Sequence, residues 1–168
     1  MTQQLSFSVA DDDTSGRGRV EDPLTGLAHR ATLDGTLLNA MAAARFAGRP
    51  LCVIVVNIDA LAAIDDAHGR PVGDAVLCRL AAILRTHCRP LDAAVRAGED
   101  RLVLVLDDTH HDQALEMVTR MRDEVAGVDW SSLANGLGVA PRFGVAADPG
   151  HGSAAALLRL AAVSGSTA

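Results

Sequence analysis

The stretch "LCVIVVNIDALAAIDDAHGRPVGDAVL", residues 51–77, decides the fold that we predict for this chain. Its first six residues are apolar and mostly β-branched, which is typical of a short buried strand. A short helix and a loop with Gly and Pro follow, and from Val72 to about His87 the apolar residues recur at helical spacing. The stretch therefore predicts a buried strand, a short helix, a loop and a longer helix.

Elements on both sides of this stretch complete one α/β domain. Pro and Gly turn residues at 21–30 open a helix that we expect to end at about Phe46. The later elements are a β-hairpin at 91–108, an amphipathic helix at 112–125, a strand at 138–148 and a short helix at 153–163. With the two helices of residues 60–87 counted together, the order is α-β-α-β-β-α-β-α. This order predicts an α+β sandwich with a mainly antiparallel sheet that is flanked by helices.

The composition argues against two classes of partner. All 15 basic residues are Arg, the net charge is −6 and there is no basic run, so we expect no nucleic-acid partner. The longest apolar run, residues 51–56, is much shorter than the roughly 20 residues that span a bilayer. We therefore expect no membrane contact. The length suffices for one domain with a hydrophobic core.

The N-terminus and the cysteines indicate a cytoplasmic protein. Residues 1–13 lack the basic start and the cleavage site of a secretory signal. Cys52, Cys78 and Cys88 are odd in number and form no C-x-x-C pair, so we expect neither structural zinc nor a disulfide framework. Residues 1–21 are polar and are predicted to be a flexible N-terminal segment, and the domain is predicted at 22–168.

Four ordered segments resemble one family. "DPLTGLAHR" at 22–30 resembles D-x-L-T-x-L-x-N-R, and residues 57–77 resemble D-I-D-x-F-K-x-I-N-D-x-x-G-H-x-x-G-D-x-x-L without a gap. "RAGEDRL" at 96–102 stands where R-x-G-G-D-E-F is expected, and "RFGVA" at 142–146 where S-x-G-V-A is expected. These are the patterns of the GGDEF domain, the diguanylate cyclase family. The resemblance implies the nucleotidyl-cyclase-like fold over most of the chain.

The resemblance also implies an active site, in which several residues depart from the pattern. A working family member joins two GTP molecules into cyclic di-GMP within a homodimer and holds divalent metal with carboxylates. Asn57 stands at the position of the first metal carboxylate, while Asp100 retains the second. Because Mg²⁺ prefers carboxylate oxygens and Asn57 has no charge, we expect no metal at this site.

The signature turn and the guanine-contacting positions are altered as well. After Gly98, Glu99 replaces the second glycine and brings bulk and negative charge to a place where backbone should approach phosphate. Arg101 replaces the acidic fourth position. Asp65 replaces a guanine-contacting Asn, and Asp74 retains the guanine-contacting Asp. We therefore expect no cyclase activity and assign no catalytic residue.

Asp74 and Asp100 also have a purely structural interpretation. A carboxylate in the first turn of a helix, where the sequence places Asp74, is stabilised by the helix dipole without any ligand. Asp100 is a residue type that is common in tight turns.

A second site is implied by "RPLD", residues 89–92. Its R-x-x-D spacing resembles the product-inhibition site of the family, which implies that Arg89 and Asp92 bind cyclic di-GMP with support from Arg120. A guanidinium can bond the O6/N7 edge of guanine, and a carboxylate can accept from its N1–H and N2–H₂. The apolar stripe of the helix that carries Arg120 is predicted to be Leu115, Val118, Met121 and Val125. Arg120 points away from this stripe, as a ligand-binding residue requires.

Three hypotheses follow. The first is a catalytically inactive GGDEF domain that acts as a cyclic di-GMP receptor and signals by dimerisation or through a protein partner. The second is an interaction module that binds no nucleotide, in which Arg89 and Asp92 form only a surface ion pair. The third is residual GTP binding at the old active site. The family's closing A-D-x-A-L-Y-x-A-K helix is absent, so a shortened C-terminal helix is expected to leave a surface open for a partner.

Overall fold

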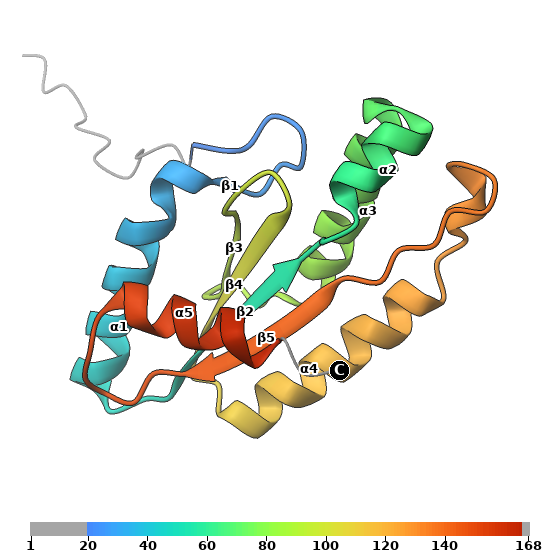
Figure 1. The fold of residues 1–168 in the computed structure, drawn as a ribbon. Helices are drawn as coiled ribbons and strands as arrows, with labels where there is room; N and C mark the ends of the chain where they lie inside the picture. The colour runs from blue at the N-terminus through green and yellow to red at the C-terminus, as the bar shows by residue number, and fades with distance from the viewer. Residues whose placement is uncertain (1–19, 166–168) are drawn as a thin grey trace, which may run out of the picture.

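The structure is a computed structural model that describes residues 20–165 of the chain (Figure 1). In chain order the elements are β1 (Ala28–His29), the 3-10 helix η1 (Arg30–Thr32), α1 (Leu33–Ala47), β2 (Leu51–Asn57), α2 (Leu61–His68), α3 (Arg70–His87), β3 (Ala93–Arg96), β4 (Arg101–Asp107), α4 (His111–Ala126), the 3-10 helix η2 (Trp130–Ser132), β5 (Arg142–Ala147) and α5 (Ala154–Ser164). The predicted flexible segment at 1–21 lies outside the described residues except for Val20 and Glu21. Both are tied to the domain, since the Val20 carbonyl accepts a hydrogen bond from the His29 N–H and Glu21 forms a β-bridge with Ala28.

The strands form one sheet in the order β1-β3-β4-β2-β5. β2 is antiparallel to both of its neighbours, β3 is antiparallel to β4, and β1 runs parallel to β3. This confirms the predicted, mainly antiparallel sheet. β5 lies at an edge, as expected for a strand that follows Pro141, which cannot donate a ladder hydrogen bond.

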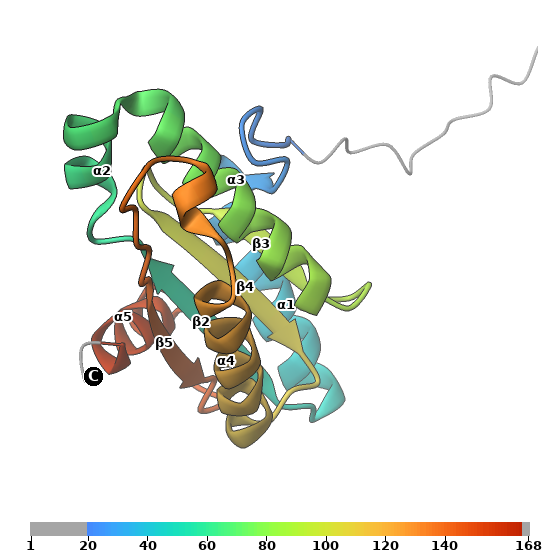
Figure 2. The same cartoon turned by 90° about the vertical axis from the view of Figure 1, so that its right-hand side faces the viewer.

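Helices cover both faces of the sheet (Figures 1 and 2). α1 and α5 pack on one face against alternate residues of the central strands, such as Val53 and Val103. α3 and α4 pack on the other face against the residues between them, such as Ile54 and Leu104. Because cores form on both sides, every residue of β2 is buried. The side chains at the end of β2 and at the β3–β4 turn are therefore held on a rigid support.

Two helix boundaries differ from the prediction. The first helix was predicted to open at 21–30 but begins only at Leu33, because the Asp22 carboxylate accepts hydrogen bonds from the N–H and hydroxyl of Thr25 and holds a turn there. The loop predicted between the two central helices is only Gly69. α3 already begins at the next residue, and Pro71 lies in its first turn, where a missing N–H costs no helical bond.

The inward face of α4 also differs in one residue. Its buried residues are Ala114, Met117, Val118, Met121 and Val125. Leu115 was predicted to face inward, but it is 47% exposed. The prediction was wrong because Ala114 and Met117 take the inward positions before and after Leu115, so that helical geometry turns Leu115 toward solvent.

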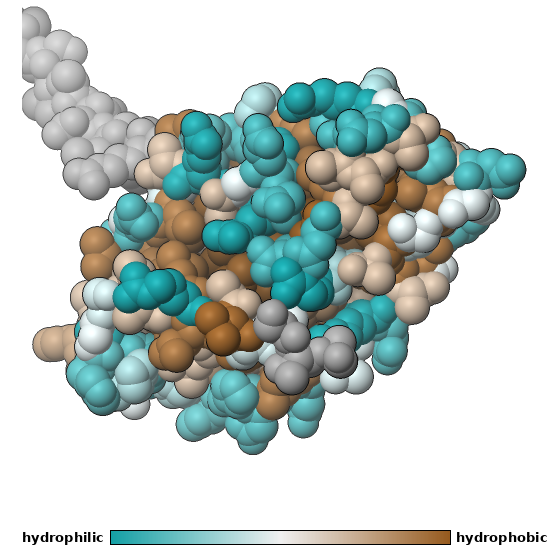
Figure 3. Space-filling view, viewed as in Figure 1, coloured by the Kyte–Doolittle hydropathy of each residue, from teal (hydrophilic) through white to brown (hydrophobic). Residues whose placement is uncertain are grey.

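α5 confirms the predicted short C-terminal helix and covers the free edge of β5. Gly144 lies so close to α5 that an added Cβ would stand 1.7 Å from the carbonyl oxygen of Ala161. The Ser164 hydroxyl accepts a hydrogen bond from the Val145 N–H at 2.8 Å and lies 2.9 Å from the carbonyl oxygen of Val145. The helix therefore satisfies edge groups that would otherwise be open to pairing with another chain. On the face formed by α1 and α5, apolar side chains are scattered between polar ones (Figure 3).

Candidate functional site

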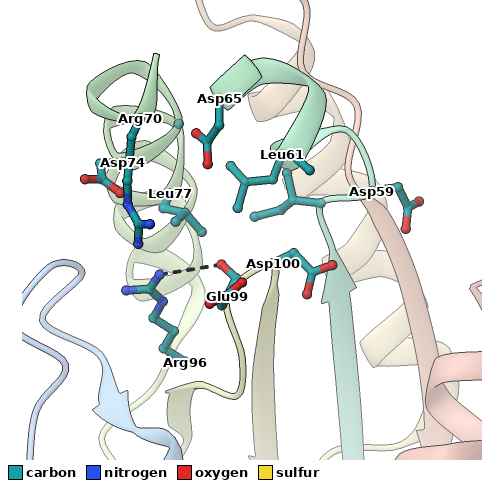
Figure 4. Close-up of a pocket in the computed structure, with 12 residues that line it drawn as sticks. Asp59, Leu61, Asp65, Arg70, Asp74, Leu77, Arg96, Glu99 and Asp100 are labelled. Atoms are coloured by element: carbon teal, nitrogen blue, oxygen red, sulfur yellow. Dashed lines mark hydrogen bonds between the residues drawn. The ribbon is translucent and has the colours of Figure 1, made fainter. Parts of the chain in front are cut away.

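A cleft lies at one end of the sheet, between α2, α3 and the β3–β4 turn (Figure 4). Its lining includes four of the residues predicted from the sequence and two guanidinium groups: Asp65, Asp74, Glu99, Asp100, Arg70 and Arg96. It encloses about 220 Å³, which is below the roughly 300–1,000 Å³ of typical small-molecule sites. The carboxylates outnumber the guanidinium groups, so the cleft opposes a triphosphate electrostatically.

Asn57 and Arg101 lie side by side across the sheet. They are register partners on β2 and β4, and the Arg101 Nε donates a hydrogen bond to Asn57 Oδ1 at 3.1 Å. A permanent positive charge is therefore bonded to the position where the family places its first metal carboxylate. An amide that is already bonded to a guanidinium, together with Asp100, does not fit Mg²⁺. Within residues 20–165, no three His, Cys, Asp or Glu side chains are grouped to hold a metal ion.

Asp65 and Asp74 occupy different environments on the two helices that border the cleft. Asp65 Oδ1 is buried and has no hydrogen-bond partner among the described residues. It lies 1.9 Å from where a Cβ on Gly73 would be, so its position requires glycine there. The interpretation of Asp74 as a first-turn residue is wrong, because α3 begins at Arg70 and has no acidic residue in its first turn.

Arg96 holds the signature turn in place. Its guanidinium donates to the carbonyl oxygens of Gly98 and Glu99 and forms an ion pair with the buried Asp22. Burial by itself would raise the pKa of Asp22, but the hydrogen bonds from Thr25 and Arg96 outweigh it and leave this pKa below its usual value. Gly98, which was predicted to belong to the active site, lines a neighbouring cavity with Arg96 and Glu99.

The turn at 89–92 is built around a buried carboxylate. The Asp92 side chain is 1% exposed. One of its oxygens accepts from the N–H and the Nε of Arg89, and the other accepts from the N–H of Asp107. Burial, with a contribution from Asp92, raises the pKa of the adjacent Cys88 thiol to about 11, so this cysteine stays protonated.

Arg89 and Arg120 line the same cavity, which we call the arginine cavity. Its other lining residues are His87, Thr109, Gln113, Glu116 and Met117. The Arg89 side chain is 54% exposed, and Arg120 is exposed on α4, as its helical phase predicted. The cavity encloses about 300 Å³, the lower end of the range for small-molecule sites. Because both guanidinium groups are exposed, a ligand bound to them would keep one face open to solvent.

Sequence reasoning did not identify Thr109 and Glu116 as members of this cavity. Thr109 is 3% exposed, and its hydroxyl accepts a hydrogen bond from the Arg89 Nη2 at 2.5 Å. Glu116 lies four residues before Arg120 on α4, so helical spacing could have placed it on the same face. No local pattern indicates the role of Thr109, since its contact with Arg89 spans 20 positions.

A mixed sheet with helices on both faces and a carboxylate-lined cleft at one end defines an α/β domain of the nucleotidyl-cyclase-like class. The family described as "Diguanylate cyclase, GGDEF domain" matches residues 20–162. The chain therefore belongs to the GGDEF domain family.

Similar proteins agree with this assignment. The chain is 34% identical over 136 residues to the response regulator PleD of Caulobacter vibrioides, covering 79% of this chain and 30% of PleD. It is 31% identical over 130 residues to the diguanylate cyclase DgcP of Pseudomonas aeruginosa, covering 77% of this chain and 19% of DgcP. The chain thus spans a third or less of the length of these relatives.

A solved structure with a similar fold is the GGDEF domain of DgcB from Caulobacter crescentus, which was determined in complex with c-di-GMP. The TM-score is 0.80 and the identity 23%, and the match covers 88% of each chain. At this identity the likeness shows the fold. Within residues 20–165, no helix has the length and apolar character needed to cross a membrane.

Proposed function

We propose that this GGDEF domain is catalytically inactive and acts as a receptor for cyclic di-GMP. The observation that carries the proposal is that Arg89 and Arg120, from separate elements, line one cavity. Guanidinium groups form charge-assisted hydrogen bonds with phosphate and also donate to the O6 and N7 atoms of guanine. Two guanidinium groups at one cavity suit a ligand that carries both phosphate and guanine.

The loss of catalysis is supported by the pair of Asn57 and Arg101. Asn57 lacks the negative charge of a metal carboxylate, and Arg101, which donates a hydrogen bond to it, adds a positive charge where a metal would be needed to bind the triphosphate. Glu99 adds a further carboxylate beside Asp100 at the cleft. All of these changes act on the triphosphate and its metal, so each would weaken GTP and metal binding.

Signalling would follow from the incomplete enclosure of the ligand. Since Arg89 and Arg120 are exposed, a cyclic dinucleotide bound to them would keep one face open, and a second copy of this domain or a protein partner can cover that face. We therefore propose ligand-linked dimerisation or partner binding. The reducing cytoplasm is the proposed compartment, because Cys52, Cys78 and Cys88 are all free thiols.

Calorimetric titration of cyclic di-GMP into the full chain tests the receptor proposal. The wild type should bind, and Arg89→Ala should lose about tenfold or more in affinity, because it removes charge-assisted hydrogen bonds. Arg159→Ala is the matched control, since Arg159 is exposed on α5, away from the arginine cavity. Absence of heat with the wild type, or equal affinities for Arg89→Ala and the control, would reject the proposal.

A second candidate function, an interaction module, is favoured by an apolar groove between α4 and β5. Val125, Val139 and Phe143 line it beside Gly165, at the end of α5. Arg122 stacks over the Phe143 ring at 5.7 Å and brings a positive charge to the groove. If this function is the correct one, Arg89→Ala will leave partner capture in a pull-down unchanged, whereas Ala126→Asp, which places a charge at an exposed position of the groove, will abolish it.

A further inference from the structure

Residues 5–13, "LSFSVADDD", combine alternating apolar side chains with three consecutive carboxylates. Leu5, Phe7 and Val9 are separated by single residues, and this period of two places apolar side chains on one face of an extended segment. Asp11–Asp13 follow after one residue. The sequence of this segment therefore suits an apolar surface with a positive charge at its margin.

The groove between α4 and β5 is a surface of this kind. It encloses about 330 Å³, and a cavity of about 150 Å³ already holds a benzene molecule, so an aromatic side chain fits. The lining of the groove is apolar except for Arg122 and Arg142. Arg142 is paired with Asp59, whereas Arg122 lies over the Phe143 ring and forms no ion pair among residues 20–165. The charge of Arg122 is therefore available to a carboxylate.

The start of the described chain and the groove lie in one row of the sheet. The Val20 carbonyl accepts a hydrogen bond from the His29 N–H, and Phe143 lines the groove. The residues in register along this row are His29, Arg96, Leu102, Val56 and Phe143. At about 4.8 Å per strand, the row is about 24 Å long from Val20 to Phe143. Val9 precedes Val20 by 11 positions, which span about 36 Å when extended and leave length for the path around the end of the sheet.

The acidic cleft lies on this path (Figure 4). Arg96, which ends β3 and belongs to the row, lines the cleft. The carboxylates of the cleft are those of Asp59, Asp65, Asp74, Glu99 and Asp100. Arg17 and Arg19 lie three positions and one position before Val20, so they pass these carboxylates first. The chain thus presents positive charge to the cleft and negative charge to Arg122, in the order in which the surface requires them.

We propose that residues 5–13 of this chain bind in the groove between α4 and β5. Phe7 lies against the apolar lining, and Asp11–Asp13 lie beside Arg122. The arginines between this segment and the domain lie along the mouth of the acidic cleft. The arginine cavity is formed by other residues, so this docking is independent of cyclic di-GMP. A protein partner that binds the groove must first displace the segment.

Fluorine NMR of the full chain labelled with fluorinated phenylalanine tests this docking, because the chain has 3 Phe residues. Two of them are internal references, since Phe46 is 96% exposed and Phe143 is 3% exposed. The change in chemical shift between H₂O and D₂O measures the exposure of each ring. The Phe7 signal, assigned by its loss in Phe7→Leu, should behave like that of Phe143. A Phe7 signal that behaves like that of Phe46 would overturn the proposal and leave the groove to a protein partner.

Charge reversal tests the contact with Arg122. Arg122→Glu should raise the exposed population of Phe7 about fivefold, the effect of losing an exposed ion pair. Arg159→Glu is the matched control, since Arg159 is exposed on α5 and does not line the groove. The small solvent effect on the Phe143 signal shows that each variant is folded. Equal exposure of Phe7 in the variant and the control would overturn the pairing with Arg122.

Dilution distinguishes docking within one chain from docking on a second copy. The Phe7 signal of the wild type should not change as the protein is diluted, because the segment and the groove belong to the same molecule. A Phe7 ring that becomes exposed on dilution would assign the segment to the groove of a second copy and would overturn docking within one chain.

Discussion

Asp22→Asn should destabilise the domain and loosen the signature turn. The Asp22 carboxylate accepts from the N–H and hydroxyl of Thr25 at 2.8 and 2.7 Å and pairs with Arg96 at 3.2 Å. The two side chains of the pair are 11% and 16% exposed. Breaking a buried pair by removing one charge costs about 3–5 kcal/mol. Asn retains an acceptor, and Arg96 keeps its bonds to the turn carbonyls, so we expect about 2–3 kcal/mol.

Urea unfolding at pH 7 measures this loss, with Asp66→Asn as the control. Asp66 is exposed on α2, and its replacement should change the free energy of unfolding by less than about 0.5 kcal/mol. The folded-state pKa of Asp22 is lowered, so its stabilisation is fully present above the unfolded pKa of about 3.9 and is lost as the pH falls through the folded value. The difference between wild type and variant should therefore be full at pH 7 and shrink below about pH 4.

Two results would refute this reasoning. One is a change at pH 7 no larger than that of the control. The other is a difference that stays constant into acid, which would show that the effect comes from side-chain shape rather than charge.

Two further predictions concern α5 and the old metal position. Gly144→Ala should lower the free energy of unfolding by about 2 kcal/mol or more, because its Cβ would stand 1.7 Å from a carbonyl oxygen of α5. Gly138→Ala is the control and should be neutral, since an added Cβ there has no neighbour within 4 Å. Equal melting temperatures for the two variants would contradict the packing described. The triple variant Asn57→Asp, Glu99→Gly and Arg101→Glu should gain Mn²⁺ binding that the wild type lacks, as measured by calorimetry. If the wild type binds Mn²⁺ as strongly as the triple variant does, the Arg101 bond does not replace the metal.

The central strand and the hairpin could be predicted from sequence because their signals are local. A short β-branched run and two such runs around a tight turn each specify a strand without reference to distant residues. The prediction for Leu115 was wrong for the opposite reason, because no local signal decides its orientation. Its inward or outward placement depends on whether Ala114 and Met117 fill the contact with the sheet, and several apolar positions on α4 allow either helical phase.

The candidate site was only partly predictable for a similar reason. The R-x-x-D spacing locates Arg89 and Asp92, but the orientation of the carboxylate depends on the N–H of Asp107, which lies 15 positions further along the chain. The contact between Arg89 and Thr109 spans 20 positions. Hydrogen bonds of this range depend on how the strands pair and leave no local pattern in the sequence.

One measurement tests the central claim, that this domain binds cyclic di-GMP and does not make it. The full chain is mixed with equimolar GTP and cyclic di-GMP in the presence of Mg²⁺, and the nucleotides that are retained with the protein and those that pass a filter are identified by chromatography over time. The account predicts that cyclic di-GMP is retained and that GTP passes the filter in an unchanged amount. Newly formed cyclic di-GMP at the expense of GTP, or cyclic di-GMP that passes the filter completely, would contradict it.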